Sequence, residues 1–234
     1  MDENSAYFCE IRDRNWQKVK FEIDYQSSTH DIREKQQIDF LLHFLQSSRN
    51  YCVCIVDMVG STITAMKMSD EKIAKYYGLF LNSMAETISS YGATIVKNIG
   101  DSLLYYFPKT DSNAIESFKD VLNCSMAMIQ KRHELNSLMR TTGLPDVSYR
   151  ISCEYGSVIV AKSSTSSVHD IFGNSVNLCS KINALASPNS TIIGKGLYEK
   201  TKLFTEYLFK EITETELSLG KEYQVYTVSM NARS

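Results

Sequence analysis

The segment Ile55-Val-Asp-Met-Val-Gly-Ser-Thr62 combines a short β-branched run, an aspartate and a Gly-Ser-Thr turn. Its β-branched residues predict a strand, and Asp57 brings a carboxylate to the end of that strand. Gly60 has no side chain, so backbone N–H groups can approach an anion there, and the hydroxyls of Ser61 and Thr62 follow. The segment therefore predicts a site for a metal ion and phosphate groups.

Three amphipathic helices are predicted on the C-terminal side of this segment. Each shows apolar residues at three- and four-residue steps, which places them on one helical face. In the first helix, Ser69 or Asp70 is suited to cap the N-terminus, and Gly92 is suited to end the helix. The predicted helices cover residues 69–91, 113–139 and 176–186.

Short apolar runs between and after these helices predict further strands. Gly100-Asp101 is a two-residue link of the kind that makes a tight hairpin, so the strands on either side of it should pair. Two more runs, separated by Gly156, are expected to form a second strand pair. The expected strands are 94–99, 102–107, 149–155, 157–161, 191–193, 210–213 and 224–230. The order β–α–β–β–α–β, with strands added at the C-terminus, predicts an α/β (α+β) fold, a ferredoxin-like sandwich.

The first part of the chain differs from the rest. Residues 1–48 are expected to form an N-terminal extension, and residues 49–234 the main domain. From Thr29 to Leu45, apolar residues recur at helical spacing behind an acidic first turn, which predicts a short amphipathic helix. Such a helix either packs on the main domain or pairs with its copy in a dimer.

The composition excludes several classes of protein. A net charge of −2 and a pI near 6.1 argue against a protein that binds nucleic acid, which would be expected to present a basic surface. No apolar run approaches the roughly 20 residues needed to span a bilayer, and residues 1–15 are too polar for a signal peptide. We therefore expect a cytoplasmic protein without a membrane span.

Two aspartates, Asp57 and Asp101, each lie where a predicted strand gives way to a turn. If the two strands are neighbours in one sheet, both carboxylates reach the same edge. Such a pair beside a Gly-Ser-Thr turn suits Mg²⁺, which takes a few protein oxygens and completes its shell with phosphate and water. The spacing alone leaves an alternative open, because an aspartate after a glycine is common in ordinary turns.

Four short segments of the chain can be compared, in their order and spacing, with those of known protein families. They are Ile55 to Thr62, Lys97-Asn-Ile-Gly-Asp101, Tyr149-Arg-Ile-Ser152 leading to Gly156, and Asp170-Ile-Phe-Gly-Asn-Ser-Val-Asn-Leu-Cys-Ser-Lys181. In order and approximate spacing, this set resembles the class III nucleotidyl cyclases, the family of adenylyl and guanylyl cyclases. The resemblance covers about Tyr51 to Val228 and identifies residues 49–234 with the catalytic domain of that family.

The resemblance implies a head-to-tail homodimer in which each active site is built from both chains. It assigns Asp57 and Asp101 to a pair that holds two divalent cations, Mg²⁺ or Mn²⁺, with the backbone at Met58 beside them. One ion would activate the ribose 3′-hydroxyl for attack on the α-phosphate, and the other would neutralise the pyrophosphate leaving group. The phosphates of the nucleoside triphosphate would lie at Gly60 to Thr62.

The resemblance also assigns residues of the opposite chain to the rest of the substrate. Lys97 and Asp170 match the positions that read the purine in adenylyl cyclases, and adenine offers the acceptor N1 and the donor N6 that an ammonium and a carboxylate suit. Asn177 matches the residue that orients the ribose. Lys181, four residues later on the same helical face, stands where the family has an arginine that contacts the α-phosphate. Lys221 is a further candidate contact for the triphosphate.

The leading expectation is a homodimeric enzyme that converts ATP to 3′,5′-cyclic AMP and pyrophosphate. A second hypothesis keeps the mechanism and changes the product to cyclic CMP or cyclic UMP, as in bacterial antiviral cyclases that resemble this family. A third, which rests on Lys181, is a catalytically weak or retired cyclase-like domain that binds nucleotide and regulates another protein. The presence of Lys97 and Asp170 favours the first hypothesis.

Overall fold

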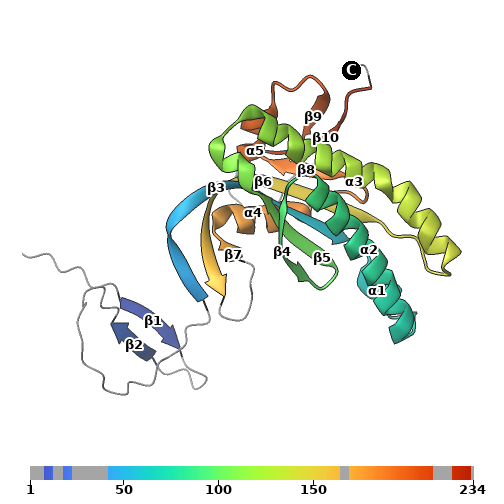
Figure 1. Cartoon of the computed structure of the whole chain (residues 1–234), viewed down its shortest axis with the longest axis horizontal. Coiled ribbons are helices and arrows are strands. Elements are labelled where there is room, and N and C mark those ends of the chain that lie inside the picture. Colours follow the sequence, from blue (N-terminus) through green and yellow to red (C-terminus); the bar gives the residue numbers. More distant parts are fainter. Residues whose placement is uncertain (1–7, 13–17, 23–41, 164–168, 213–222, 233–234) are drawn as a thin grey trace, which may run out of the picture. The chain divides into compact units, whose positions relative to one another are not determined.

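The computed structural model (Figure 1) describes residues 8–12, 18–22, 42–163, 169–212 and 223–232. The chain divides into two compact units, Met1–Asp39 and Phe40–Ser234. In the first unit, strands β1 (Phe8–Arg12) and β2 (Lys18–Glu22) pair as an antiparallel two-stranded sheet.

The described part of the second unit begins with a strand where the end of a helix was predicted. Strand β3 spans Leu42–Met58, so the helix prediction is wrong for residues 42–45, while residues 29–41 lie outside the described part of the chain. The reason is tertiary, because Leu42 lies opposite Ser163 in an antiparallel ladder and sheet pairing overrides a local helical period. This strand also explains why the second unit starts before Arg49, where the main domain was expected to begin.

Eight strands form one sheet in the second unit, in the order β4-β5-β3-β6-β8-β10-β9, with β7 paired to β6. Its strands are β3, β4 (Thr94–Ile99), β5 (Ser102–Phe107), β6 (Tyr149–Ser163), β7 (His169–Phe172), β8 (Thr191–Gly194), β9 (Tyr207–Glu211) and β10 (Val225–Met230). The first four, with one long helix after β3 and another after β5, have the chain order and the sheet order of a ferredoxin-like sandwich. The predicted fold class is confirmed, including the added C-terminal strands.

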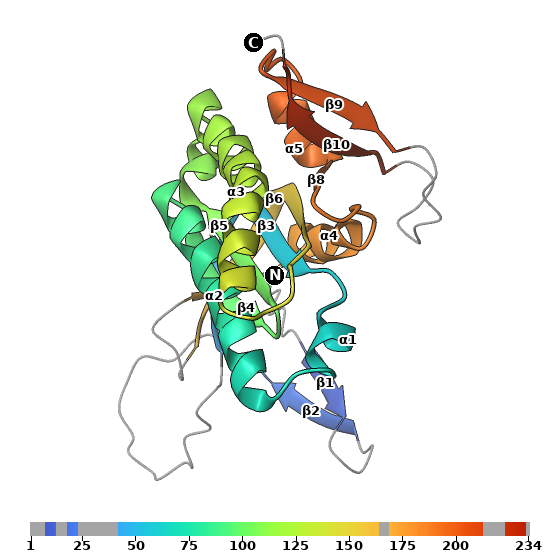
Figure 2. The same ribbon diagram turned by 90° about the vertical axis from the view of Figure 1, so that its right-hand side faces the viewer.

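Helices lie on both faces of this sheet. Figure 2 shows β3 and β6 between helices α2 and α3 on one side and α4 on the other. The helical elements are α1 (Ser61–Ala65), α2 (Asp70–Ser90), the 3-10 helix η1 (Pro108–Ser112), α3 (Ile115–Thr141), α4 (Asn174–Asn183) and α5 (Lys195–Thr201). Among the described residues, no helix is long and apolar enough to cross a membrane.

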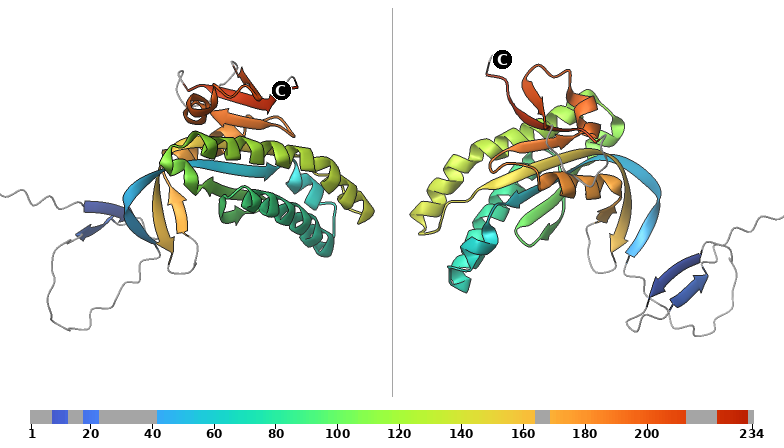
Figure 3. Two further views of the ribbon diagram at one scale, coloured as in Figure 1. Left: turned by 45° about the horizontal axis from the view of Figure 1, so that its top comes forward. Right: turned by 180° about the vertical axis from the view of Figure 1, so that it is seen from behind.

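Gly156 does not separate two strands, as the sequence had suggested, but lies inside the continuous strand β6. The absence of a side chain at Gly156 allows α4 to pack close to the strand, since a Cβ atom at this position would lie 2.5 Å from Oγ of Ser175 in α4. Strands β3 and β6 curve together toward β7 (Figure 3). The continuous strand β6 therefore both packs against α4 and pairs with β7.

Successive side chains of β3 point alternately into the main core and to the opposite face of the sheet. Cys52, Cys54 and Val56 are fully buried and belong to the large core beneath α2 and α3. Val53 instead packs in a second cluster that includes Cys179 of α4. Because side chains alternate along a strand, Asp57 shares the face of Val53. The carboxylate at the strand end therefore lies on the α4 side of the sheet.

Candidate functional site

Both carboxylate oxygens of Asp57 are engaged by the neighbouring strands. Ser102 on β5 donates a hydrogen bond from Oγ to Oδ1 at 2.6 Å. Arg150 on β6 donates from Nε at 3.0 Å and from Nη2 at 2.9 Å to Oδ2. These contacts follow from the strand register, in which Asp57 lies opposite Ser102 on one side and Arg150 on the other. The carboxylate is thus held in a defined orientation at the end of the sheet.

Asp101 reaches the same end of the sheet through the β4–β5 hairpin. Gly100 has a φ of 63°, a left-handed conformation that favours glycine and permits the two-residue link. Asp101 directly precedes Ser102, the residue opposite Asp57. The structure therefore brings the two predicted metal ligands to one edge, as the sequence suggested.

The turn after Asp57 leads directly into helix α1. The side chain of Met58 is buried in the core, so this residue could serve a metal ion only through its backbone. Gly60 adopts φ 71° and precedes the helix, whose first residues are the buried Ser61 and the exposed Thr62. The first N–H groups of a helix have no acceptor within the helix. The predicted phosphate contact at this turn is compatible with that arrangement.

Lys97 on β4 and Asp170 on β7 form an ion pair, with 2.5 Å between Nζ and Oδ2. The lysine side chain is 45% exposed and the aspartate side chain 19% exposed. The second oxygen of Asp170, Oδ1, accepts a hydrogen bond from the backbone N–H of Ile171 at 2.9 Å. The two residues assigned to the nucleobase are therefore neighbours within one chain, at a surface that a ligand can reach.

Asn177 and Lys181 lie on the exposed face of α4, four residues apart as predicted. The opposite face of this helix is anchored by Cys179, which is fully buried. Its Sγ lies 3.3 Å from the carbonyl oxygen of Val53, and its own carbonyl accepts a hydrogen bond from Ser152 Oγ at 2.9 Å. The anchor holds α4 on β3 and β6 and leaves both polar side chains at the surface. Lys221 lies outside the described residues.

Sequence reasoning missed two residues of this site, Arg150 and Ser102. Both lie within or beside the recognised segments, and Ser102 directly follows Asp101. Their role in holding Asp57 depends on the register of β5 and β6 against β3. That register was not predicted from the sequence, so neither contact could be assigned in advance.

Aromatic pairs lie on the strands that carry the site. Tyr51 on β3 stacks on Tyr106 of β5 with ring centroids 4.7 Å apart. Phe172 meets Phe44 edge to face with centroids 5.3 Å apart. Phe172 is two residues from Asp170 and therefore on the same face of β7. These rings provide apolar surface along the strands that hold the polar groups.

A buried acid, Glu154, occupies the middle of β6 and is only 3% exposed. Its Oε1 accepts a hydrogen bond from the backbone N–H of Gly196 at 3.1 Å. Burial raises the pKa of Glu154 to about 7, and hydrogen bonds from the backbone N–H groups of Gly196 and Tyr155 partly offset this effect. This carboxyl group therefore changes its protonation near neutral pH.

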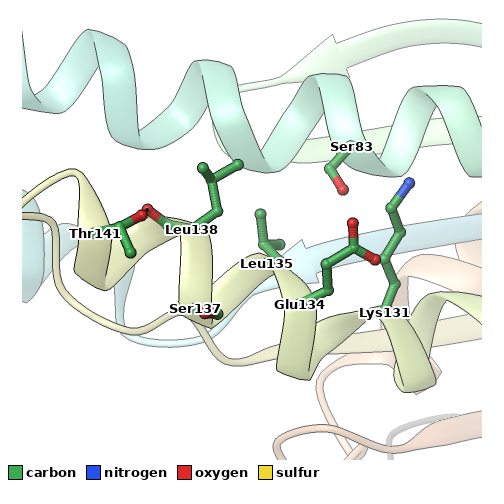
Figure 4. A pocket seen from close by; sticks show the side chains of 7 residues that line it. All are labelled: Ser83, Lys131, Glu134, Leu135, Ser137, Leu138 and Thr141. Carbon is green, nitrogen blue, oxygen red and sulfur yellow. Dashed lines mark hydrogen bonds between the residues drawn. The ribbon is translucent and has the colours of Figure 1, made fainter.

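A groove of about 360 Å³ between α2 and α3 contains none of the predicted site residues (Figure 4). It is lined by Ser83, Lys131, Glu134, Leu135, Ser137, Leu138 and Thr141. Lys131 also forms an ion pair with Glu86 at 2.8 Å. The groove lies on the face of the sheet opposite α4, so the polar residues around Asp57 remain the candidate site.

Comparison with known proteins finds a matching family model and similar sequences. Residues 44–230 match the family model of the adenylate and guanylate cyclase catalytic domain. Similar curated proteins include a cytidylate cyclase of Staphylococcus aureus and an adenylate cyclase of Streptomyces coelicolor, 25% and 24% identical over 152 residues each. These alignments cover 62% and 65% of this chain but 36% and 34% of the relatives, so the chain spans about a third of their length.

The fold also matches that of a solved structure. The adenylyl cyclase CyaB from P. aeruginosa is similar with a TM-score of 0.72 and 20% sequence identity. The match covers 80% of this chain and 97% of that chain. At this identity the comparison establishes the fold alone.

Proposed function

Because the chain belongs to the adenylate and guanylate cyclase catalytic domain family, we propose that it converts ATP to 3′,5′-cyclic AMP and pyrophosphate. The observation that favours ATP over GTP is the ion pair between Lys97 and Asp170. An ammonium beside a carboxylate offers a donor for adenine N1 and an acceptor for adenine N6–H. The cyclase chemistry itself is supported by the family match and by Asp57 and Asp101.

The residues at the end of β3 fit two divalent cations, Mg²⁺ or Mn²⁺. Asp57 and Asp101 offer carboxylate oxygens at one edge, and the backbone of Met58 offers a further oxygen nearby in the chain. Within the described residues, no group of three or more His, Cys, Asp or Glu side chains could hold a metal ion. Two carboxylates completed by substrate phosphates and water are nevertheless typical of Mg²⁺ sites. When bound, the cations would activate the ribose 3′-hydroxyl and neutralise the leaving pyrophosphate.

The chain's own residues have separate roles in this proposal. Asn177 orients the ribose, Lys181 offers positive charge to the α-phosphate, and the turn from Gly60 to Thr62 receives phosphate oxygens. Lys221 remains a candidate triphosphate contact outside the described residues. Asn177 and Lys181 are exposed in the single chain, which a site shared across a homodimer requires. Each site is therefore proposed to take its metal ligands from one protomer and its base and ribose contacts from the other.

Competition among the four nucleoside triphosphates tests the proposal. Purified protein is incubated with equimolar ATP, GTP, CTP and UTP and with Mn²⁺ or Mg²⁺, and the products are identified by chromatography. Cyclic AMP should dominate, and Asp57→Ala should abolish its formation. If no cyclic nucleotide forms with either metal and Asp57→Ala behaves like the native protein, the proposed cyclase activity is refuted.

Cyclic CMP is the second candidate product, favoured by the similarity to a cytidylate cyclase. Cytosine presents the acceptor N3 beside the donor N4, the same pattern as N1 and N6 of adenine. Lys97 and Asp170 therefore suit either base at its hydrogen-bonding edge. Uracil offers N3–H and O4 instead, which reverses the pattern and makes cyclic UMP less favoured. Cyclic CMP as the main product of the mixture would replace ATP by CTP in the proposal and leave the cyclase mechanism in place.

A further inference from the structure

The carboxylate proposed to bind metal already has a cation on one of its oxygens. Two N–H groups of the Arg150 guanidinium, at 3.0 and 2.9 Å, converge on Oδ2 of Asp57. Both side chains are partly buried, with 28% of the arginine and 19% of the aspartate exposed. Hydrogen bonds between two charged groups in such a setting are stronger than neutral ones. The contact is therefore a significant part of the environment of this oxygen.

The other oxygen of Asp57 has a different kind of partner. Oδ1 accepts a hydrogen bond from the neutral hydroxyl of Ser102. An oxygen that accepts one neutral hydrogen bond keeps its charge and a lone pair for a metal ion. Oδ2, by contrast, is neutralised by a guanidinium that carries a full positive charge at any accessible pH. A cation that approaches Asp57 thus meets a competitor on Oδ2 and an orienting group on Oδ1.

Arg150 also contacts the helix that carries the predicted ribose and phosphate residues. Its Nη1 donates to the carbonyl oxygen of Ala184, at the C-terminal end of α4, at 3.5 Å. The C-terminal end of a helix bears partial negative charge, so a guanidinium is favourable there. The arginine therefore has a second acceptor available when its contact with Asp57 weakens.

We infer that Arg150 is a positioning residue that competes with the divalent cation for Oδ2 of Asp57. In the protein without metal, the guanidinium holds the carboxylate in place and offsets its charge. Metal binding displaces the guanidinium from Oδ2, while Ser102 continues to orient the carboxylate through Oδ1. The inference rests on the proposed role of Asp57 as a metal ligand.

Mn²⁺ binding without nucleotide tests this competition directly. The dissociation constant is measured from the electron paramagnetic resonance signal of free Mn²⁺, with the rise in melting temperature on adding Mn²⁺ as a second readout. Arg150→Gln should bind Mn²⁺ roughly tenfold more tightly, because the ion no longer displaces a charge-assisted contact. Unchanged or weaker binding by Arg150→Gln would overturn the inference.

Arg150→Lys tests whether direct contact or positive charge in general controls the affinity for Mn²⁺, and Arg140→Gln serves as the control. Arg150→Lys keeps the positive charge but loses the planar fork, so it should bind Mn²⁺ more tightly than the native protein. It also decides the question if Arg150→Gln does not fold. Tighter binding by Arg150→Gln with native affinity in Arg150→Lys would show that charge alone acts, and would overturn the competition. Arg140→Gln, which removes the two bonds from Arg140 to Asp146, is the matched control and should not alter Mn²⁺ binding.

Asp57→Ala distinguishes failure of this inference from failure of the proposed function. If Asp57→Ala binds Mn²⁺ like the native protein, the proposed metal site is wrong and the inference falls with it. If Asp57→Ala loses binding while Arg150→Gln and Arg150→Lys keep native affinity, the metal site stands and only the competition is refuted.

Discussion

Lys97 Nζ lies 2.5 Å from Asp170 Oδ2, although the two residues are 73 positions apart in the sequence. Their strands are not paired with each other, since β4 pairs with β5 and β7 pairs with β6. The strands meet because β3 and β6 curve and bring β7 against β4 (Figure 3). An ion pair this exposed contributes little to stability. This small contribution is consistent with the proposed role of the pair in base recognition.

Lys97→Met should therefore lower kcat/KM much more than it lowers stability. Loss of a charged donor to the base should reduce kcat/KM for the preferred triphosphate roughly tenfold to a hundredfold. The midpoint of urea unfolding should hardly change. Lys131→Met, which breaks the ion pair with Glu86 between α3 and α2, is the matched control and should keep native kinetics. Similar losses in both variants would argue against base recognition by Lys97.

Lys181→Arg should increase the turnover number. A guanidinium presents a planar set of five donors to a phosphate, whereas the ammonium of Lys181 is a point charge. Because a single such contact can change kcat by about 100-fold, a gain of roughly threefold to tenfold is expected for the better-matched group. Steady-state kinetics at saturating triphosphate measure it, with Lys195→Arg as a control at an exposed lysine elsewhere. A lower kcat in Lys181→Arg would show that the site is built around lysine.

Mixing two inactive variants should restore activity if the sites are shared. Asp57→Ala removes a metal ligand and Asn177→Ala removes the ribose contact, so each homodimer should be inactive. A mixed dimer would contain one site that lacks both residues and one site that lacks neither. Activity measured across mixing ratios should rise to a maximum near equal amounts. The shared-site geometry fails if mixed dimers form, as shown by native mass spectrometry, and activity does not return.

Glu154→Gln should alter how stability depends on pH. Burial raises the pKa of Glu154 from the usual 4.5 to about 7, so the native state binds this proton more tightly than the unfolded state does. The resulting stabilisation is complete below about pH 4.5 and is lost as the pH rises through about 7. Its upper limit is roughly 3 kcal/mol, from the size of the pKa shift.

Urea unfolding of both proteins at several pH values measures this effect. From pH 5 to pH 8 the native protein should lose stability relative to Glu154→Gln, because glutamine does not ionise. Comparing the two proteins at each pH cancels the contributions of other titrating groups. A constant difference between them across this range would contradict the raised pKa.

Gly156→Ala should destabilise the domain by displacing α4. The added methyl group would meet Ser175 Oγ at 2.5 Å, and the serine could move only by giving up its 3.1 Å hydrogen bond to the carbonyl of Ser157. We expect a loss of about 1–3 kcal/mol in the free energy of unfolding. Ser175→Ala should largely rescue Gly156→Ala in the double variant. If the two losses simply add, the proposed clash is not the cause.

Most of the fold could be predicted because its signals are local. Gly100-Asp101 marks a hairpin through the conformation of two residues, and the apolar periods of α2 and α3 extend over several turns. The errors at residues 42–45 and at Gly156 have a different origin. There, strand pairing and the approach of α4 decided the conformation, and neither leaves a local pattern in the sequence.

The sequence by itself identified the residues of the candidate site, because Asp57, Asp101, Asn177 and Lys181 occur in short segments that resemble those of the class III nucleotidyl cyclases. Only the tertiary structure decided which groups touch. The pairing of Asp57 with Arg150 depends on β6 lying beside β3, and the pairing of Lys97 with Asp170 depends on the curvature of those strands. Both are long-range contacts set by sheet order and packing, which are properties of the whole domain rather than of any segment.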